Sequence, residues 1–136
     1  MSNIGLKFGN FNQHAGEVVT LTARIPALIS DIAKTFKTFE CTDCTQAIVS
    51  ALKKEGVSGE IVTLNANSTR RGYIYSETAA KLNGDGGIIS SSGLHQGVLV
   101  DGKVYDNIHT NGIDYNDWLK DFEVLGGFKE PSKTKF

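Results

Sequence analysis

Apolar positions recur at helical spacing in two neighbouring stretches of the chain. Between residues 25 and 39 the apolar side chains fall on one side of a helix, and Pro26 suits its first turn. Between residues 43 and 56 a second apolar stripe follows Asp43, which is expected to cap the helix together with Gln46. Gly56 is a natural stop for this second helix. Because only residues 40–42 separate the two predicted helices, we expect them to meet at a sharp turn and to pack together.

The pattern then changes to β-branched and alternating residues, which is typical of strands. Strands are predicted over residues 59–65 and 88–90, with a shorter one over 73–75 and one or two helical turns over 76–82. A last helix is predicted over residues 115–122, with its apolar side chains buried. The expected fold class is therefore α+β, with helices packed on a small antiparallel sheet.

Asp101-Gly102 stands between two apolar runs and predicts a two-residue type I′ hairpin turn. This turn fixes the register of the hairpin. Val100 lies opposite Lys103, and the pairing continues away from the turn until Gly97 lies opposite Asp106. A one-residue bulge would change the register and bring Asn107 into the place of Asp106.

Both ends of the chain lack a clear period. Residues 1–24 are predicted to be a linker or an N-terminal arm, within which residues 17–23 could form a short strand. Residues 124–125 could add an edge strand, and residues 129–136 are predicted to be a flexible tail. The domain itself is expected over residues 25–128.

Composition narrows the function classes. A chain of 136 residues fits one domain, and 14 Lys+Arg against 15 Asp+Glu leave no basic surplus for nucleic acid. No apolar run approaches the roughly 20 residues that span a bilayer, and the first residues lack the pattern of a signal peptide. We therefore expect neither nucleic-acid binding nor membrane binding by this domain.

Cys41 and Cys44 form a C-x-x-C pair at the predicted start of the second helix. Zinc would need more ligands than the scattered His14, His95 and His109 supply, so neither a metal nor a cofactor is expected. With Asp43 as the cap, Cys44 occupies the first helical position, where unpaired N–H groups and the helix dipole favour a thiolate. Cys44 is therefore the candidate nucleophile, and a buried structural cysteine is the alternative.

His95 and Asp106 lie on one face of the predicted hairpin. They are diagonal neighbours in the predicted register, with Cα atoms roughly 7–8 Å apart. A carboxylate in this position can hold one imidazole nitrogen and leave the other for a thiol. An ordinary cross-strand polar pair would give the same pattern.

The order of these motifs resembles the papain superfamily, and most closely the papain-fold toxin domains of bacterial polymorphic toxin systems. The matching patterns are F-x-C-x-x-C-x-x-A-I from Phe39, I-x-S-x-G-x-H-Q from Ile89, and V-x-D-N-x-H-x-x-G from Val104. The last pattern is followed by the predicted helix that carries Trp118. The resemblance as a whole covers roughly residues 36–125.

The resemblance implies a papain-like fold and a catalytic set of Cys44, His95 and Asp106. Gln96, Asn107 and Thr42 are possible supporting residues. It further implies a C-terminal effector domain of a larger secreted protein that is delivered to the cytoplasm of a neighbouring bacterium. There it would act on a target-cell protein, and a cognate immunity protein would neutralise it in the producer.

The sequence also departs from papain-type peptidases. The oxyanion glutamine expected six residues before the nucleophile is replaced by Thr38, and the tryptophan expected after it by Thr45. The N–H of Cys44 could still donate to an oxyanion. Peptidase, amidase, deamidase and transglutaminase-like reactions therefore remain open. A non-catalytic protein-binding domain and a C-x-x-C redox module are the alternatives.

Overall fold

The computed structural model describes residues 24–68, 72–83 and 86–136. The chain forms a helix over residues 24–33, followed by further helices with short strands between and after them. The remaining helices are α2 (Cys41–Lys54), α3 (Glu77–Asn83) and α4 (Tyr115–Lys120). The strands are β1 (Glu60–Asn65), β2 (Ile74–Ser76), β3 (Ile88–Ser90), β4 (Leu94–Val100), β5 (Lys103–Tyr105), β6 (Ile113–Asp114), β7 (Phe122–Glu123) and β8 (Ser132–Lys135).

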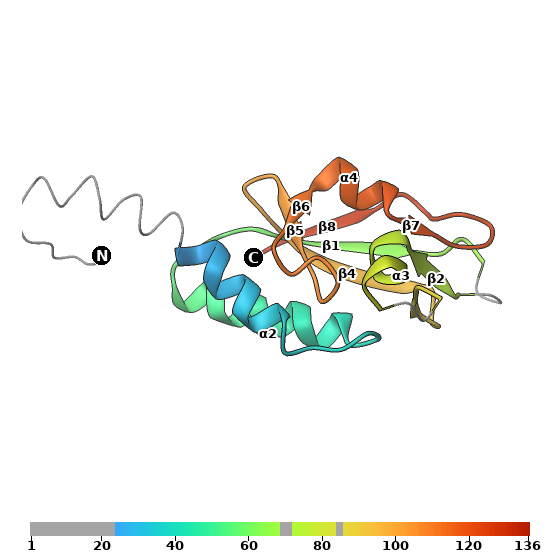
Figure 1. Cartoon of the computed structure of the whole chain (residues 1–136). Coiled ribbons are helices and arrows are strands. Elements are labelled where there is room, and N and C mark those ends of the chain that lie inside the picture. Colours follow the sequence, from blue (N-terminus) through green and yellow to red (C-terminus); the bar gives the residue numbers. More distant parts are fainter. Residues whose placement is uncertain (1–23, 69–71, 84–85) are drawn as a thin grey trace, which may run out of the picture.

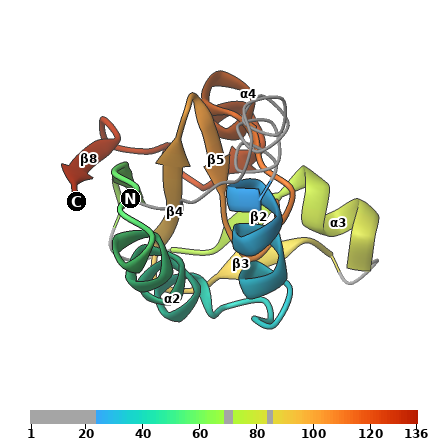
Figure 2. The same ribbon diagram turned by 90° about the vertical axis from the view of Figure 1, so that its left-hand side faces the viewer.

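Two antiparallel sheets organise the described chain. A five-stranded sheet has the order β6-β5-β4-β1-β8, and a three-stranded sheet has the order β3-β2-β7. Helix 24–33 and α2 lie side by side at one end, and α3 and α4 lie toward the second sheet (Figure 1). Figure 2 shows the same two helices in front of β4 and β5. The α+β fold class predicted from the sequence is confirmed.

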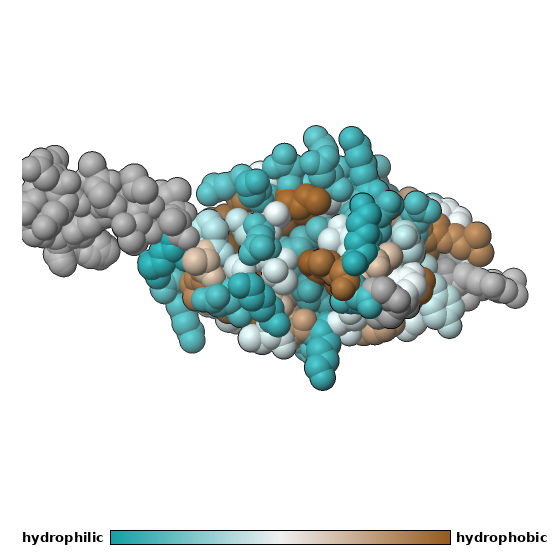
Figure 3. Space-filling model, viewed as in Figure 1, coloured by the Kyte–Doolittle hydropathy of each residue, from teal (hydrophilic) through white to brown (hydrophobic). Residues whose placement is uncertain are grey.

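Two hydrophobic cores lie on opposite faces of β4. Val98 faces α2 and packs with Ile48 and Leu52, all of them fully buried. The second core contains Trp118 and Phe122 and fills the space between the two sheets. The face seen in Figure 3 is mostly hydrophilic, with apolar residues in separate small groups.

The predicted hairpin is confirmed. Asp101 and Gly102 have φ angles of 52° and 81°, as a type I′ turn requires, and Val98 pairs with Tyr105. The end of α2 also agrees with the sequence. Gly56 has a φ of 73°, and the N–H of Val57 donates to the carbonyl of Leu52 at 2.9 Å, which closes the last turn.

Several predicted boundaries are wrong. The first helix ends at residue 33, not 39, and Phe39 is 58% exposed with a left-handed φ of 76°. The last helix ends at Lys120, so Phe122 belongs to β7, and Leu125 is exposed outside any strand. The helix over 77–83 and the strand over 60–65 agree with prediction. Of the arm predicted over 1–24, residues 1–23 lie outside the described residues, and residue 24 already belongs to the first helix.

The C-terminal residues form a strand and not a flexible tail. Ser132–Lys135 pairs with β1, and the N–H of Phe136 donates to the carbonyl of Gly59 at 3.0 Å. Phe136 packs against the α2 core. This strand was not predicted because the segment is polar and lacks an alternating apolar pattern. An edge strand gains its stability from backbone pairing and needs few apolar side chains.

Candidate active site at the start of helix α2

Helix α2 begins at Cys41, three residues before the predicted start. Glu40 occupies the N-cap position, and no side chain caps the helix there, so Asp43 is not the cap. The chain reaches this point through Phe39, whose left-handed backbone redirects it into the helix. Cys41 is therefore the first helical residue, while Cys44 lies one turn further on.

The loop before α2 is anchored by Asn107. Its Nδ2 donates to the carbonyl of Lys37 at 2.7 Å, and the N–H of Glu40 donates to the same carbonyl at 3.1 Å. Glu40 closes the loop by accepting the N–H of Lys37 at 2.7 Å. Asn107 thus supports the position of the helix start and does not replace Asp106 beside the histidine.

His95 and Asp106 form the contact that the hairpin register predicts. Nε2 of His95 lies 2.8 Å from Oδ2 of Asp106, and both side chains are fully buried. Among the described residues, Nδ1 of His95 has no hydrogen-bond partner of ordinary geometry. This leaves Nδ1 for a reacting group, the arrangement that a catalytic imidazole needs.

Cys41, and not Cys44, is the thiol that interacts with His95. Burial by itself would raise the pKa of Cys41, but the neighbouring imidazole of His95 and the backbone N–H of Gln96 together lower it. Burial would likewise lower the pKa of His95, but Asp106 and Cys41 raise it to about 9. Both shifts act in the direction of a thiolate paired with an imidazolium.

Cys44 has the opposite environment. Its side chain is fully buried in the α2 core, and burial, followed by the charges of Asp106 and Cys41, raises its pKa to about 12. Its N–H donates to the carbonyl of Glu40 at 3.0 Å, so that group is not free for an oxyanion. The geometry thus moves the candidate nucleophile from Cys44 to Cys41.

Gln96 and Thr42 both lie beside Cys41. The N–H of Gln96 stabilises the thiolate, and Oγ1 of Thr42 lies 4.0 Å from Sγ of Cys41. The side-chain Nε2 of Gln96 is already bonded to Thr63 at 3.2 Å. Two of the three residues named from the sequence as possible supporting groups therefore lie beside the Cys41 thiol.

Asp106 has more partners than the sequence indicated. It accepts hydrogen bonds from Nε1 of Trp118 at 2.7 Å and from the N–H groups of Ile108 and His109 at 2.9 and 2.5 Å. Nδ1 of His109 lies 2.9 Å from its Oδ1. Burial would raise the pKa of Asp106, but the two histidines hold it well below its usual value. The spacing Asp106-x-x-His109 was the available signal for this partner, but in the sequence His109 stood out only as one of three scattered histidines.

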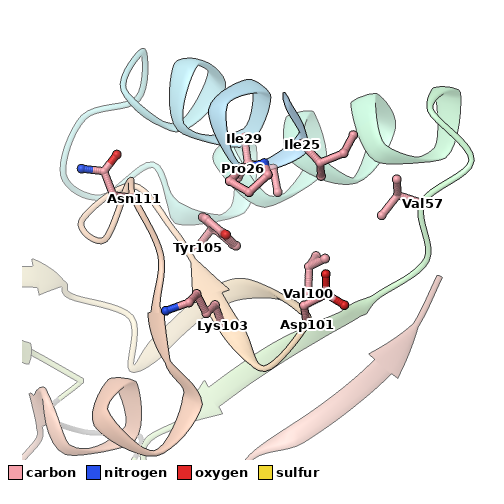
Figure 4. A pocket seen from close by; sticks show the side chains of 9 residues that line it. All are labelled: Ile25, Pro26, Ile29, Val57, Val100, Asp101, Lys103, Tyr105 and Asn111. Atoms are coloured by element: carbon pink, nitrogen blue, oxygen red, sulfur yellow. The ribbon is translucent and has the colours of Figure 1, made fainter. Parts of the chain in front are cut away.

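Other features of the described residues are separate from this site. No group of three or more His, Cys, Asp or Glu there is arranged to hold a metal ion, and no helix there is long and apolar enough to cross a membrane. A cavity of about 410 Å³ lies between helix 24–33 and the β4–β5 hairpin, lined by residues such as Ile29, Val100 and Tyr105 (Figure 4). Cys41, His95 and Asp106 do not line it.

Comparison with protein families decides the class of the domain. Residues 25–123 match the family model described as papain fold toxin 2. The chain belongs to the papain fold toxin 2 family. No curated protein and no solved structure was found to match the chain. The papain-like fold and the toxin class expected from the sequence are thereby confirmed, and the matched range contains Cys41, His95, Asp106 and Trp118.

Proposed function

We propose that this papain-fold toxin domain is a cysteine enzyme whose nucleophile is Cys41. In this proposal His95 is the general acid and base, and Asp106 orients it. The observation that supports it best is the position of the Cys41 thiol at the start of α2, next to an imidazole whose far nitrogen is held by a buried carboxylate. The substrate is a carboxamide or a peptide bond of a target-cell protein.

The proposed reaction starts from a Cys41 thiolate and a His95 imidazolium in the free enzyme. The Cys41 thiolate attacks the carbonyl carbon, and the C=O electron pair moves to the oxygen. When the C–N bond breaks, His95 gives its Nδ1 proton to the leaving nitrogen, and a thioester remains on Cys41. A water or amine then loses a proton to His95, attacks the thioester, and releases the acid or a new amide together with the thiolate.

The start of α2 also offers a donor for the oxyanion. Among the described residues the N–H of Cys41 has no hydrogen-bond acceptor, as expected for the first position of a helix. It points from the positive end of a 14-residue helix, which stabilises negative charge. This N–H takes the role that the sequence had assigned to the N–H of Cys44.

A redox function is the second candidate, because the two thiols are unlike each other. A low-pKa thiol at a helix start followed by a buried thiol of high pKa is the arrangement of C-x-x-C redox proteins. The buried His95–Asp106 pair favours acyl transfer instead, because a dithiol reaction needs no carboxylate-oriented imidazole. The two candidates differ in what they require of Cys44.

The test is growth of bacteria that express the chain as wild type, Cys41→Ala or Cys44→Ala. The two substitutions are the same chemical change in the same helix, one turn apart. Circular dichroism establishes that each variant is folded. We expect wild type and Cys44→Ala to arrest growth and Cys41→Ala to be harmless.

Each other outcome has a distinct meaning. Loss of toxicity in both folded variants would favour the redox function, since only that reaction needs both thiols. Toxicity of both variants would exclude a thiol reaction and leave a non-catalytic binding domain as the explanation. Rescue of growth by a co-expressed candidate immunity protein would identify that partner and establish that its complex blocks the toxin.

A further inference from the structure

His109 lies between two buried carboxylates behind the proposed catalytic pair. Its Nδ1 is 2.9 Å from Oδ1 of Asp106, and its Nε2 is 3.1 Å from Oδ2 of Asp121. The His109 side chain is 4% exposed, and those of Asp106 and Asp121 are 0% and 8% exposed. An imidazole with a carboxylate at each nitrogen is held with both nitrogens protonated.

Asp121 is itself fixed by the second sheet. Its Oδ2 accepts from the hydroxyl of Ser76 at 2.6 Å, and its Oδ1 accepts from the N–H and the hydroxyl of Thr78 at 3.0 and 2.8 Å. The backbone carbonyl of Asp121 accepts from the N–H of Glu77 at 3.0 Å. The carboxylate therefore joins the end of α4 to the β2–α3 junction and has little freedom to turn away from His109.

Together these contacts form a line of alternating charge that runs from the thiol into the second sheet. It begins with Cys41 and His95, continues through Asp106 and His109, and ends at Asp121. Each inner member has an oppositely charged group on both sides. The line crosses from α2 through the five-stranded sheet to the three-stranded sheet, and the aromatic rings of Trp118 and Phe122 pack beside it.

We propose that His109 and Asp121 are positioning residues for the Cys41–His95–Asp106 site. His109, kept cationic by Asp121, fixes the carboxylate of Asp106 in the orientation that holds His95, and its positive charge stabilises the Cys41 thiolate at a distance. This inference rests on the proposed function for the meaning of the site, and it adds residues that have no contact with the reacting atoms.

The charge states agree with this role. Burial would lower the pKa of His109, but the adjacent carboxylates of Asp106 and Asp121 raise it to about 9. The pKa of Asp121 is lowered, because His109, Ser76 and Thr78 outweigh the effect of burial. Within the described part of the chain, the charged groups that face His109 are these two carboxylates, with His95 on the far side of Asp106.

The experiment measures the rate of Cys41 alkylation by iodoacetamide across pH, in the full chain carrying Cys44→Ala so that a single thiol reacts. We expect His109→Gln to raise the alkylation midpoint of Cys41, because glutamine keeps an N–H donor but lacks the charge. Well below the midpoint, a shift of roughly 0.5 to 1 pH unit corresponds to a loss of roughly 3- to 10-fold in alkylation rate. Toxicity should fall as well, because a smaller fraction of Cys41 is then in the reactive thiolate form.

Asp121→Asn provides a second variant in which His109 is retained. At acidic pH, where His109 is still protonated, the alkylation rate of Cys41 in Asp121→Asn should equal that of wild type. At alkaline pH it should equal that of His109→Gln, because His109 without the Asp121 carboxylate loses its proton at a lower pH than in wild type. Asp117→Asn is the matched control, because Asp117 is an exposed carboxylate on the neighbouring helix α4. It should leave the profile unchanged.

The inference is overturned if folded His109→Gln and Asp121→Asn both give the wild-type alkylation profile. If His109→Gln does not fold, the profile of Asp121→Asn decides alone. Failure of the proposed function is a different result, since it is seen as toxicity that persists in Cys41→Ala. If the variants alter the alkylation profile but the domain stays toxic without Cys41, the line of alternating charge is supported and its role in catalysis is rejected.

Discussion

Trp118 and His95 donate to the same oxygen of Asp106. The indole Nε1 lies 2.7 Å from Oδ2, and Nε2 of His95 lies 2.8 Å from it, while the two rings stack with centroids 5.8 Å apart. The tryptophan thus does two things at once: it fills the core between the sheets and it fixes the oxygen that orients the histidine. A buried aromatic residue with one polar atom can do both.

Trp118→Phe separates these two roles. The phenyl ring keeps most of the apolar contact, but Oδ2 of Asp106 loses a charged hydrogen bond that is worth about 1.5–3 kcal/mol when buried. We expect the free energy of unfolding, measured by urea denaturation, to fall by roughly that amount, and toxicity to fall as well. Leu119→Ala on the same helix is a control for packing alone, since Leu119 is only partly buried against this core. If Trp118→Phe retains full stability, the indole bond contributes little.

The titration of His95 should depend on Cys41. The thiolate contributes to the raised pKa of about 9, so Cys41→Ala should lower the pKa of His95, with Asp106 left as its charged partner among the described residues. NMR titration of the imidazole signals in wild type and variant measures the change. The Cys44→Ala variant should titrate like wild type. Equal titration of His95 in all three proteins would contradict the pairing of Cys41 with His95.

The stability of the domain should fall as the pH rises above neutrality. His95 and His109 have pKa values of about 9 in the fold, above the usual value of about 6.5 in an unfolded chain. Their stabilisation is complete below about pH 6.5 and is lost as the pH rises through about 9. Urea midpoints measured across this range should decrease, and His109→Gln should flatten the dependence. The lowered pKa of Cys41 offsets the contribution of His95 over part of this range, so a midpoint that is constant between these pH values would exclude a raised pKa of His109.

Removal of residues 131–136 should destabilise the domain, because this segment is a strand. The deletion exposes the edge of β1 and removes Phe136 from the α2 core. Complete removal of a buried phenylalanine side chain costs about 3–5 kcal/mol, and Phe136 is only partly buried, so we expect a loss of about 2 kcal/mol or more. Phe136→Ala tests the side chain separately from the strand. A truncated chain as stable as wild type would show that residues 131–136 do not stabilise the fold.

Gly97 should resist replacement, because it lies under the aromatic residue that holds Asp106. A Cβ at this position would meet Cγ1 of Val104 at 2.6 Å and Cζ2 of Trp118 at 3.3 Å. Overpacking of this kind typically costs about 1–3 kcal/mol, and here it would also shift the indole. Gly102→Ala is the matched control on the same hairpin, since a Cβ added there would meet no atom within 4 Å and only the positive φ is strained. We expect Gly97→Ala to reduce toxicity more than Gly102→Ala does.

The local sequence determined the hairpin and the His95–Asp106 pair. Asp101-Gly102 permits a turn in which both residues have positive φ, and this turn sets the register over the adjoining strands. Strand alternation then places His95 and Asp106 on one face without further information. Helix α2 and its end at Gly56 were equally local, because apolar periodicity and a left-handed glycine act within a few residues.

Only the tertiary structure decided which thiol faces the histidine. Local capping favoured Asp43, but the bond from Asn107 to the carbonyl of Lys37 and the left-handed Phe39 start the helix at Cys41. A shift of three residues gives Cys41 the first helical position and places Cys44 in the core, one turn further on. The pairing of β8 with β1 and the contacts of His109 with Asp121 depend in the same way on segments distant in the chain. Such contacts leave no period in the sequence, because their energy comes from charge and backbone pairing between elements that only the fold brings together.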